Sequence, residues 1–432
     1  MMRKTLPLFI SPALLAAVLI LVLPRLLRTG AHRPDDHEAG VDTYREVYAL
    51  AKRTAYREVP DEELIAGAAN GMLKVIDRYS RAYDPKQWQR FQRRSEGRAL
   101  GVGIIFTRLE GGVRILRIMP NSPASRADLR PGDKVIAVDD DVLPEDADAT
   151  LLQTMLEGAT ARKIRLKLEA LSDGSVRTVT VVRGTYATPS ILTQWLEEEQ
   201  VLYLKCSRFH EETDEEIARA LIAAEDRHLA GIVLDLRDNS GGSLSGAVGV
   251  VSAFAHPPVV VVAAHRDRRV DYPPSASPVD METPLCILVD EHSASASEVV
   301  AGALQDLMRG TVVGTRTFGK GVMQNIYALR TREMGVKLTT ARWLTPSGRS
   351  VQQGAGGGGG GIIPDVFASR PKSEESLLGE WWSRLDVPDE LVALMEKDES
   401  RVHIGPRFRD SQLAVALKVL KGEPVLEAVS GS

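Results

Sequence analysis

The sequence has little cysteine and little net charge, and each shortage excludes some classes of function. Its 432 residues include two cysteines, Cys206 and Cys286, which stand in apolar runs. We therefore expect small buried side chains there rather than a disulfide framework. No CxxC pair or cysteine–histidine cluster indicates a metal site. The formal charge of −4 gives no electrostatic case for nucleic acid as a partner.

The first 30 residues have the pattern of an export signal or a membrane anchor. Arg3 and Lys4 precede an uncharged stretch over residues 5–24, which is rich in Leu, Ala, Val and Ile, and three arginines follow it. No A-x-A cleavage site follows the stretch, which favours an uncleaved anchor over a secreted product. Positive charge flanks both ends, so the orientation stays open. We expect the rest of the chain to lie outside the cytoplasm, in the periplasm or cell envelope.

Helical patterns occupy the two flanking regions, residues 31–97 and 371–432. Apolar residues recur there at helical spacing, and Pro60 followed by acidic residues predicts a helix start. Neither region carries a pattern of chemically active residues. Helices at both ends of the chain favour packing or self-association, so we expect a homo-oligomer.

The pattern over residues 98–184 predicts short strands with glycine turns and one short helix. Its order and its GVGI segment resemble a bacterial PDZ domain. Glycines in that segment would let backbone N–H groups point into a cleft for a terminal carboxylate, and the strand at 102–107 would offer an edge to a peptide. The expected substrate-binding residues are Leu100, Gly101, Val102, Gly103 and Ile104. A PDZ-like module that serves only packing remains the alternative.

Residues 185–370 alternate between strand and helix patterns. This alternation predicts a mostly parallel or mixed sheet with a functional site at its strand ends. The fold class that we expect is therefore α/β (α+β) and multidomain, with the PDZ-like segment inserted between the N-terminal helical region and this core.

The stretch GTRTFGKG, residues 314–321, raises the question of a nucleotide-binding loop. Its spacing matches a P-loop up to the last position, where a P-loop needs Ser or Thr to hold magnesium and this chain has Gly321. The apolar run that ends at Asp235 could pass for the matching magnesium-binding strand. An ATPase is therefore a hypothesis, weakened by Gly321 and by the export pattern at the N-terminus.

The stretch SASASE, residues 293–298, supports two interpretations. Ser295 and Glu298 have the spacing of a helix capping box. Alternatively, Ser295 stands at a strand-to-helix junction as a nucleophile, with the N–H of Ala296 directed at an oxyanion.

A serine nucleophile needs a base. Lys320, flanked by two glycines and by Phe318, could be held neutral by an apolar setting. His292 with Asp235 is the alternative base arrangement.

SASASE, TFGKG, Gln324 and the upstream LDLRDNSGG together resemble the C-terminal processing (tail-specific) serine proteases, over most of the chain. The resemblance implies a mixed-sheet protease core of the crotonase/ClpP-like type. It implies Ser295 as nucleophile, Lys320 as general base and Gln324 as the residue that orients the lysine. It also implies an oxyanion hole from Gly241 or Gly242 together with Ala296. Asp235 and Arg237 then become structural, as a buried ion pair.

The implied activity is endoproteolysis of protein substrates near or from their C-termini, after the PDZ domain has bound the tail. No metal or organic cofactor is implied, and an adaptor protein that recruits substrates is left open. The alternative is a non-catalytic, membrane-anchored PDZ scaffold, which would be expected to have lost Ser295 or Lys320. The glycine run at 356–361 lengthens a loop that is normally short in the family.

Overall fold

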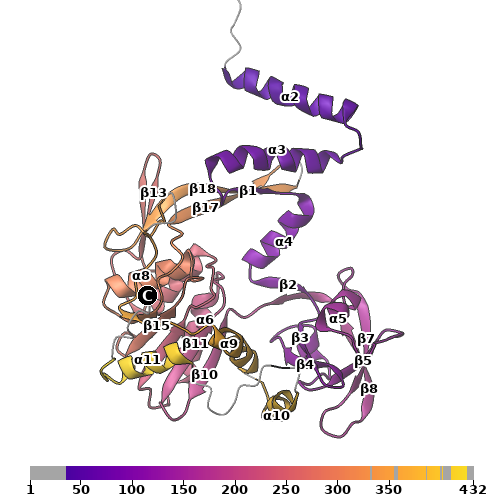
Figure 1. Ribbon diagram of the computed structural model, residues 1–432, viewed down its shortest axis with the longest axis vertical. Coiled ribbons are helices and arrows are strands. Elements are labelled where there is room, and N and C mark those ends of the chain that lie inside the picture. The colour runs from indigo at the N-terminus through magenta and orange to yellow at the C-terminus, as the bar shows by residue number, and fades with distance from the viewer. Residues whose placement is uncertain are drawn as a thin grey trace, which may run out of the picture. The chain divides into compact units, whose positions relative to one another are not determined.

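The computed structural model describes residues 36–330, 333–354, 359–385, 387–398, 401 and 410–425. The chain divides into two compact units, with the boundary between Ala69 and Asn70 (Figure 1). The apolar stretch at 5–24 lies outside the described residues. Within the described ranges, no helix is both long enough and apolar enough to cross a membrane.

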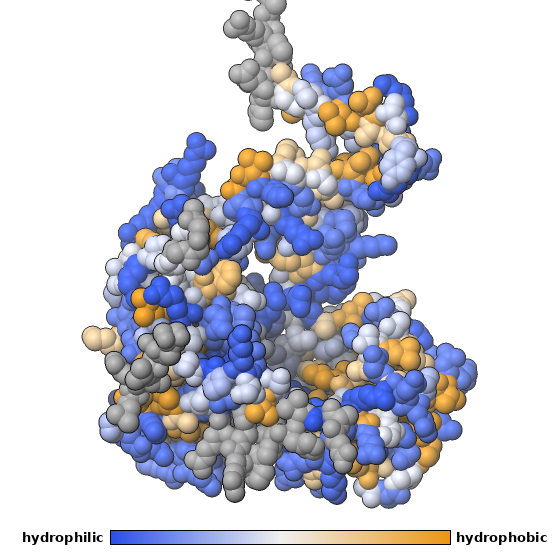
Figure 2. Space-filling model, in the orientation of Figure 1, coloured by the Kyte–Doolittle hydropathy of each residue, from blue (hydrophilic) through white to orange (hydrophobic). Residues whose placement is uncertain are grey.

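The N-terminal unit contains helix α2 (Asp36–Thr54) and the first part of α3 (Asp61–Ile76). Helix α2 is amphipathic, and its apolar side chains are exposed: Val47 is 61% and Leu50 50% accessible. Figure 2 shows apolar surface on this helix. The predicted helices are confirmed here.

Residues 81–83 depart from the predicted helical pattern of this region. Strand β1 (Arg81–Tyr83) precedes helix α4 (Pro85–Ser95), which starts at a proline and is capped by the side chain of Asp84. The strand forms because Ala82 pairs with Val336 of a distant strand. This pairing joins both elements to the larger unit, and it has no local sequence signal.

The PDZ-like segment is a twisted antiparallel sheet with the strand order β3-β4-β5-β7-β8. Alternate residues of its strands are buried, as in the run over β7, and their side chains build a separate core. Strand β3 is at the edge of the sheet, and helix α5 (Ala149–Met155) contacts it. The strands are β3 (Ile104–Leu109), β4 (Gly112–Ile118), β5 (Lys134–Val138), β7 (Lys163–Glu169) and β8 (Val176–Val182), with β6 (Asp141–Val142) beside β5. A two-stranded ribbon, β2 (Arg98–Gly101) with β9 (Gly184–Ala187), joins the two ends of the segment.

The central layer of the larger unit is a six-stranded sheet with the order β10-β11-β12-β15-β16-β19. Its first pair is antiparallel and the others are parallel, so the carboxyl ends of five strands meet at one edge. The strands are β10 (Ile191–Leu196), β11 (Val201–Cys206), β12 (Gly231–Asp235), β15 (Leu285–Val289), β16 (Thr311–Gly314) and β19 (Val366–Phe367). The predicted α/β core is confirmed.

Helices cover both faces of this sheet. One face buries alternate strand residues under α6 (Thr213–Ala223), α7 (Leu244–Phe254) and α8 (Ala296–Asp306). The other face packs under α9 (Ser373–Arg384) and α11 (Ser411–Leu420), and α11 lies across the sheet in Figure 1. Cys206 and Cys286 are buried and unpaired, as predicted.

A second sheet contains the strand that follows Lys320. Its order is β1-β18-β13-β14, with β17 paired to β18. The bounds are β13 (Val261–His265), β14 (Arg269–Tyr272), β17 (Val322–Leu329) and β18 (Met334–Leu344). The remaining helix, α10 (Asp389–Lys397), packs Leu391 and Met395 against Leu109 and Leu116 of the PDZ-like sheet.

Candidate active site

Ser295 stands at the carboxyl edge of the central sheet, between β15 and α8, as the sequence predicts. Its φ of 59° and ψ of −112° place a non-glycine residue in a sparsely populated backbone region. Such a turn between strand and helix exposes a serine hydroxyl and directs the next N–H toward the same space. The conformation fits a nucleophile better than an ordinary helix cap, which has extended dihedral angles.

Glu298 links the serine turn to the lysine loop. Its carboxylate accepts hydrogen bonds from the N–H groups of Ser295 and Lys320, both at 2.8 Å. It also accepts the N–H of Gly319 at 2.7 Å and the hydroxyl of Thr317 at 2.6 Å. The side chain is fully buried, and burial raises the pKa of its carboxyl group against these hydrogen bonds. The spacing of Ser295 and Glu298 in the sequence predicts their contact as a capping box. The contacts of Glu298 with Thr317, Gly319 and Lys320 join residues that are 19 to 22 positions apart, and no local sequence pattern predicts them.

The environment of Lys320 makes its neutral form more accessible than that of an exposed lysine. Burial, and then the charge of Lys337, lower the pKa of Lys320 to about 8, while Glu298 and Asp77 oppose the change. The ammonium group lies 5.2 Å from the ring centroid of Tyr79. Lys320 can therefore lose its proton near neutral pH, as a base must.

Gly321 and the strand after it show that the stretch GTRTFGKG is not a nucleotide-binding loop. A Cβ atom at this position would lie 2.6 Å from the backbone nitrogen of Gln352, so only glycine fits. A strand, β17, follows the loop, whereas a P-loop leads into a helix whose N-terminus holds phosphate. The ATPase hypothesis is wrong for this reason.

Two backbone N–H groups are free to hold an oxyanion. The N–H groups of Gly242 and Ala296 have no hydrogen-bond partner among the described residues. Gly241 differs, because its N–H donates to Oδ1 of Asn239 at 2.9 Å. The backbone at Gly242, with φ of 156°, passes so close to Phe209 that a Cβ atom would lie 2.1 Å from its carbonyl oxygen. Of the two predicted glycines, the structure leaves Gly242 available.

Gln324 lies at an irregularity of β17, on the wall of the same cavity as Lys320. Its amide nitrogen donates to Oγ1 of Thr339 at 3.3 Å and to the carbonyl oxygen of Val322 at 3.4 Å. The structure thus brings Gln324 to the site and ties it to the neighbouring strand.

The predicted ion pair between Asp235 and Arg237 is present and completely buried, at 2.5 Å. Arg237 also binds Asp410 at 2.6 Å, which ties the start of α11 to the segment that follows β12. Burial alone would raise the pKa of Asp235, but the charges of Arg237 and Lys205 lower it to about 2. Asp235 is therefore committed to this network, and His292 is exposed. The arrangement of Ser295, His292 and Asp235 as a triad is excluded.

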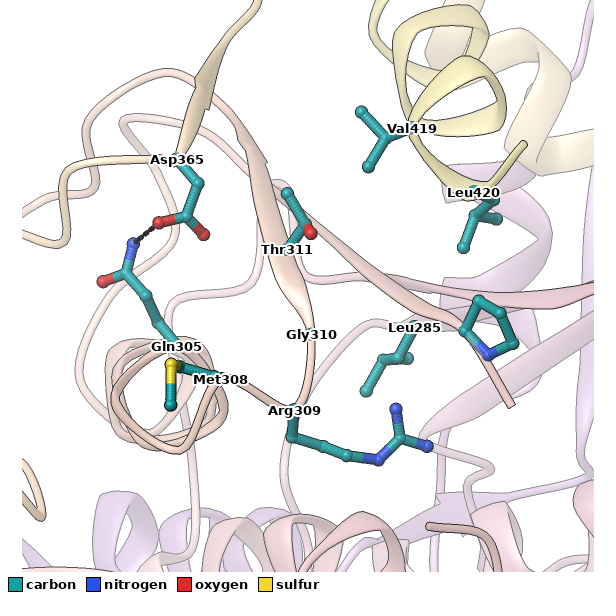
Figure 3. Close-up of a pocket in the computed structure, with 10 residues that line it drawn as sticks. Leu285, Gln305, Met308, Arg309, Gly310, Thr311, Asp365, Val419 and Leu420 are labelled. Carbon is teal, nitrogen blue, oxygen red and sulfur yellow. Dashed lines mark hydrogen bonds between the residues drawn. The ribbon is translucent and has the colours of Figure 1, made fainter. Parts of the chain in front are cut away.

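The predicted catalytic residues line one cavity of about 730 Å³. Its walls include Gly242, Ser295, Ala296, Lys320 and Gln324. A second cavity, of about 370 Å³, lies at the amino ends of β15 and β16 (Figure 3). There Gln305 donates to Asp365 at 2.8 Å, and the other walls include Arg309 and Thr311 beside apolar residues. No serine of the described residues lines this second cavity, whereas Ser295 and Lys320 both line the first.

The predicted tail-binding residues lie on the ribbon and loop that lead into the PDZ-like sheet. Leu100 and Gly101 end β2, and Ile104 begins the edge strand β3. Between them, the N–H groups of Val102 and Gly103 have no hydrogen-bond partner within the described part of the chain. Gly103 has φ of 84° and lies against Ser122. Free N–H groups beside an open strand edge suit a peptide carboxylate.

Comparisons with known proteins give matches over most of the chain. Residues 200–367 match peptidase family S41, and residues 114–169 match a PDZ domain. The carboxy-terminal-processing protease of Bartonella bacilliformis is 30% identical over 387 residues, which cover 86% of each chain. The carboxyl-terminal-processing protease of Synechocystis is 28% identical over 75% of each chain. A solved photosystem II D1 C-terminal processing protease is 27% identical, with a TM-score of 0.43, over 76% of this chain and 86% of its own.

Proposed function

Because this chain belongs to the C-terminal processing serine proteases of peptidase family S41, with a PDZ domain, we propose that Ser295 and Lys320 act as its catalytic dyad. Membership makes the protein a serine-type peptidase. The observation that carries the dyad is one cavity that holds a serine on a strained turn and a lysine with a lowered pKa.

The reaction is an acyl transfer in two steps. Neutral Lys320 takes the proton of the Ser295 hydroxyl, and the oxygen attacks a peptide carbonyl carbon. The N–H groups of Gly242 and Ala296 stabilise the oxyanion. The lysine ammonium then gives its proton to the leaving amine, which leaves an acyl-enzyme. Lys320 next takes a proton from water, whose oxygen attacks the acyl carbon. The lysine ammonium then gives this proton to the serine oxygen as the second product, a carboxylic acid, is released.

The PDZ domain supplies the choice of substrate. We infer that the free carboxylate of a protein tail binds the N–H groups of Val102 and Gly103, and that the tail extends the sheet along β3. The cleaved bond would then lie near the C-terminus of the substrate.

Placement in the cell and assembly are also proposals. The apolar stretch at 5–24 supports a membrane anchor with the enzyme outside the cytoplasm. The exposed apolar face of α2 supports a homo-oligomer, since such residues are usually covered in the working state. An adaptor protein would add a further level of substrate choice. Protease protection of intact cells and light scattering of the purified protein test the first two proposals.

The dyad is tested by proteolysis of an unstructured polypeptide with an apolar C-terminus. We expect the full-length protein to cleave it, and Ser295→Ala and Lys320→Ala to be folded and inactive. His292→Ala serves as the matched control, because His292 lines the cavity and has no role in the mechanism. Full activity of Lys320→Ala would refute the dyad. Tail binding without any cleavage would favour the alternative of a PDZ scaffold.

A further inference from the structure

Two cations besides the proposed base line the catalytic cavity. Arg208 follows β11, and Lys337 lies on β18. Arg208 adjoins Phe209, which forms a β-bridge with Gly242, so it stands next to the oxyanion loop. Lys337 stands opposite Ile326 in the register of β17 and β18. Both side chains are half-buried.

Neither cation is neutralised by the protein. The buried Nε atom of Arg208 has no hydrogen-bond partner among the residues that the structure describes, and its neighbouring charge is another cation, Arg94. No carboxylate of the described residues forms an ion pair with either side chain. Burial, and then the positive charges of Arg81 and Arg208, lower the pKa of Lys337.

Within the described ranges, the acidic groups near Arg208 and Lys337 do not form ion pairs with these two cations. Asp77 attracts Lys337, but its carboxylate accepts the N–H groups of Tyr79 and Ser80, does not line the cavity and forms no ion pair with Lys337. Glu211 and Asp238 line the cavity as well, and both are exposed to solvent, where charge is screened. The Glu298 carboxylate is held by the N–H group of Lys320 and three other donors, so Arg208 and Lys337 are two cations of the cavity wall without a paired carboxylate among the described residues.

We propose that Arg208 and Lys337 form a subsite for a carboxylate of the substrate beside the cleaved bond, so that they determine specificity. The proposal rests on the proposed protease function and specifies its substrate class. A carboxylate would bind the planar guanidinium group through two oxygens and would relieve the repulsion between the two cations. In a polypeptide this group is either an Asp or Glu side chain or the terminal carboxylate.

The test compares peptides that place Glu, or Gln as its neutral equivalent, at successive positions around the cleaved bond. At one position we expect the full-length enzyme to favour Glu by about tenfold in kcat/KM, equivalent to about 1.4 kcal/mol. A second pair of peptides, with a free or an amidated C-terminus, tells a side-chain carboxylate from the terminal one.

Variants of Arg208 and Lys337 test whether these two residues cause the preference for Glu over Gln. Arg208→Gln and Lys337→Gln should bring the Glu-to-Gln ratio close to one, and Lys337→Arg should keep it. Lys337→Glu should reverse it, so that a Lys peptide is cleaved faster than the Gln peptide. Arg219→Gln, an exposed change on α6, should leave the ratio unchanged.

The results of these cleavage assays distinguish failure of the proposed subsite from failure of the protease function. Equal cleavage of all peptides by the unmodified enzyme would overturn the subsite and leave the protease intact. A preference that survives in both Gln variants would also overturn it. No cleavage of any peptide would overturn the protease function, and the subsite with it.

Discussion

Replacement of Glu298 by Gln tests whether one buried carboxylate aligns the nucleophile with the base. Oε2 of Glu298 accepts from the N–H groups of Ser295 and Lys320, and Oε1 accepts from Gly319 and Thr317. A glutamine side chain has the same shape but one oxygen. In either orientation its NH2 group would face at least one backbone N–H group, and two donors repel.

The structure sets the size of the effect. A buried donor that loses its acceptor costs about 1–3 kcal/mol, so we expect Glu298→Gln to lower the free energy of unfolding by about 2 kcal/mol. The loops that carry Ser295 and Lys320 would also shift relative to each other. A misplacement of about 1 Å costs a factor of about 100 in rate, so kcat should fall on the order of 100-fold.

The pH profile separates alignment from charge. The carboxylate of Glu298 raises the pKa of Lys320, which burial and Lys337 lower to about 8. Without this negative charge the ammonium form is less stable, so the pKa of Lys320 falls further. The acidic limb of the kcat profile should therefore move to lower pH in Glu298→Gln, even as the maximal rate falls.

Peptide cleavage from pH 5 to pH 10 and urea unfolding measure both effects. Glu216→Gln is the matched control, since this half-buried carboxylate also accepts two backbone N–H groups, from Ser190 and Ile191, but lies outside the catalytic cavity. Both N–H groups donate to one oxygen, Oε2, which the amide oxygen of glutamine can replace, so this variant should keep both its stability and its kcat. The reasoning is refuted if Glu298→Gln is folded and keeps its rate within twofold, or if its acidic limb moves to higher pH.

Three further predictions follow from the site and its support. Activity should fall about tenfold per pH unit below about 8, because only neutral Lys320 can accept the serine proton; a flat pH–rate profile from 6 to 9 would contradict this. Gly242→Ala should abolish cleavage, because the new methyl group would lie 2.1 Å from a carbonyl oxygen; circular dichroism tells local from global damage. Arg237→Met should lower the free energy of unfolding by about 3–5 kcal/mol in urea titrations, since it leaves Asp235 and Asp410 buried without their cation. A loss below about 1 kcal/mol would mean that water reaches this network.

Local sequence was sufficient to predict the α/β core and to propose the candidate residues of its loops. The alternation of strand and helix predicted the α/β core, because strands buried on both faces need apolar runs that are visible in one dimension. Ser295 was found because a strand, a small-residue turn and an amphipathic helix are consecutive. Lys320 was found because its glycine neighbours and its distance from Ser295 matched a family pattern.

Contacts between distant segments were not predictable in this way. Strand β1 exists because Ala82 pairs with Val336, and the partner of Arg237 that fastens the C-terminal helix, Asp410, is 173 residues away. The same holds for Glu298, whose spacing to Ser295 predicts only a cap.

The sequence by itself determined which residues could do chemistry, since side-chain type and the order of strand, turn and helix are local properties. Only the tertiary structure decided which of them meet. Among the described residues, it left the N–H group of Gly242, rather than that of Gly241, free for the proposed oxyanion hole, held Asp235 in a buried ion pair, and brought Arg208 and Lys337 into the cavity that Lys320 lines. Hydrogen-bond partners, burial and charge repulsion depend on distances through space, and a sequence pattern does not contain those distances.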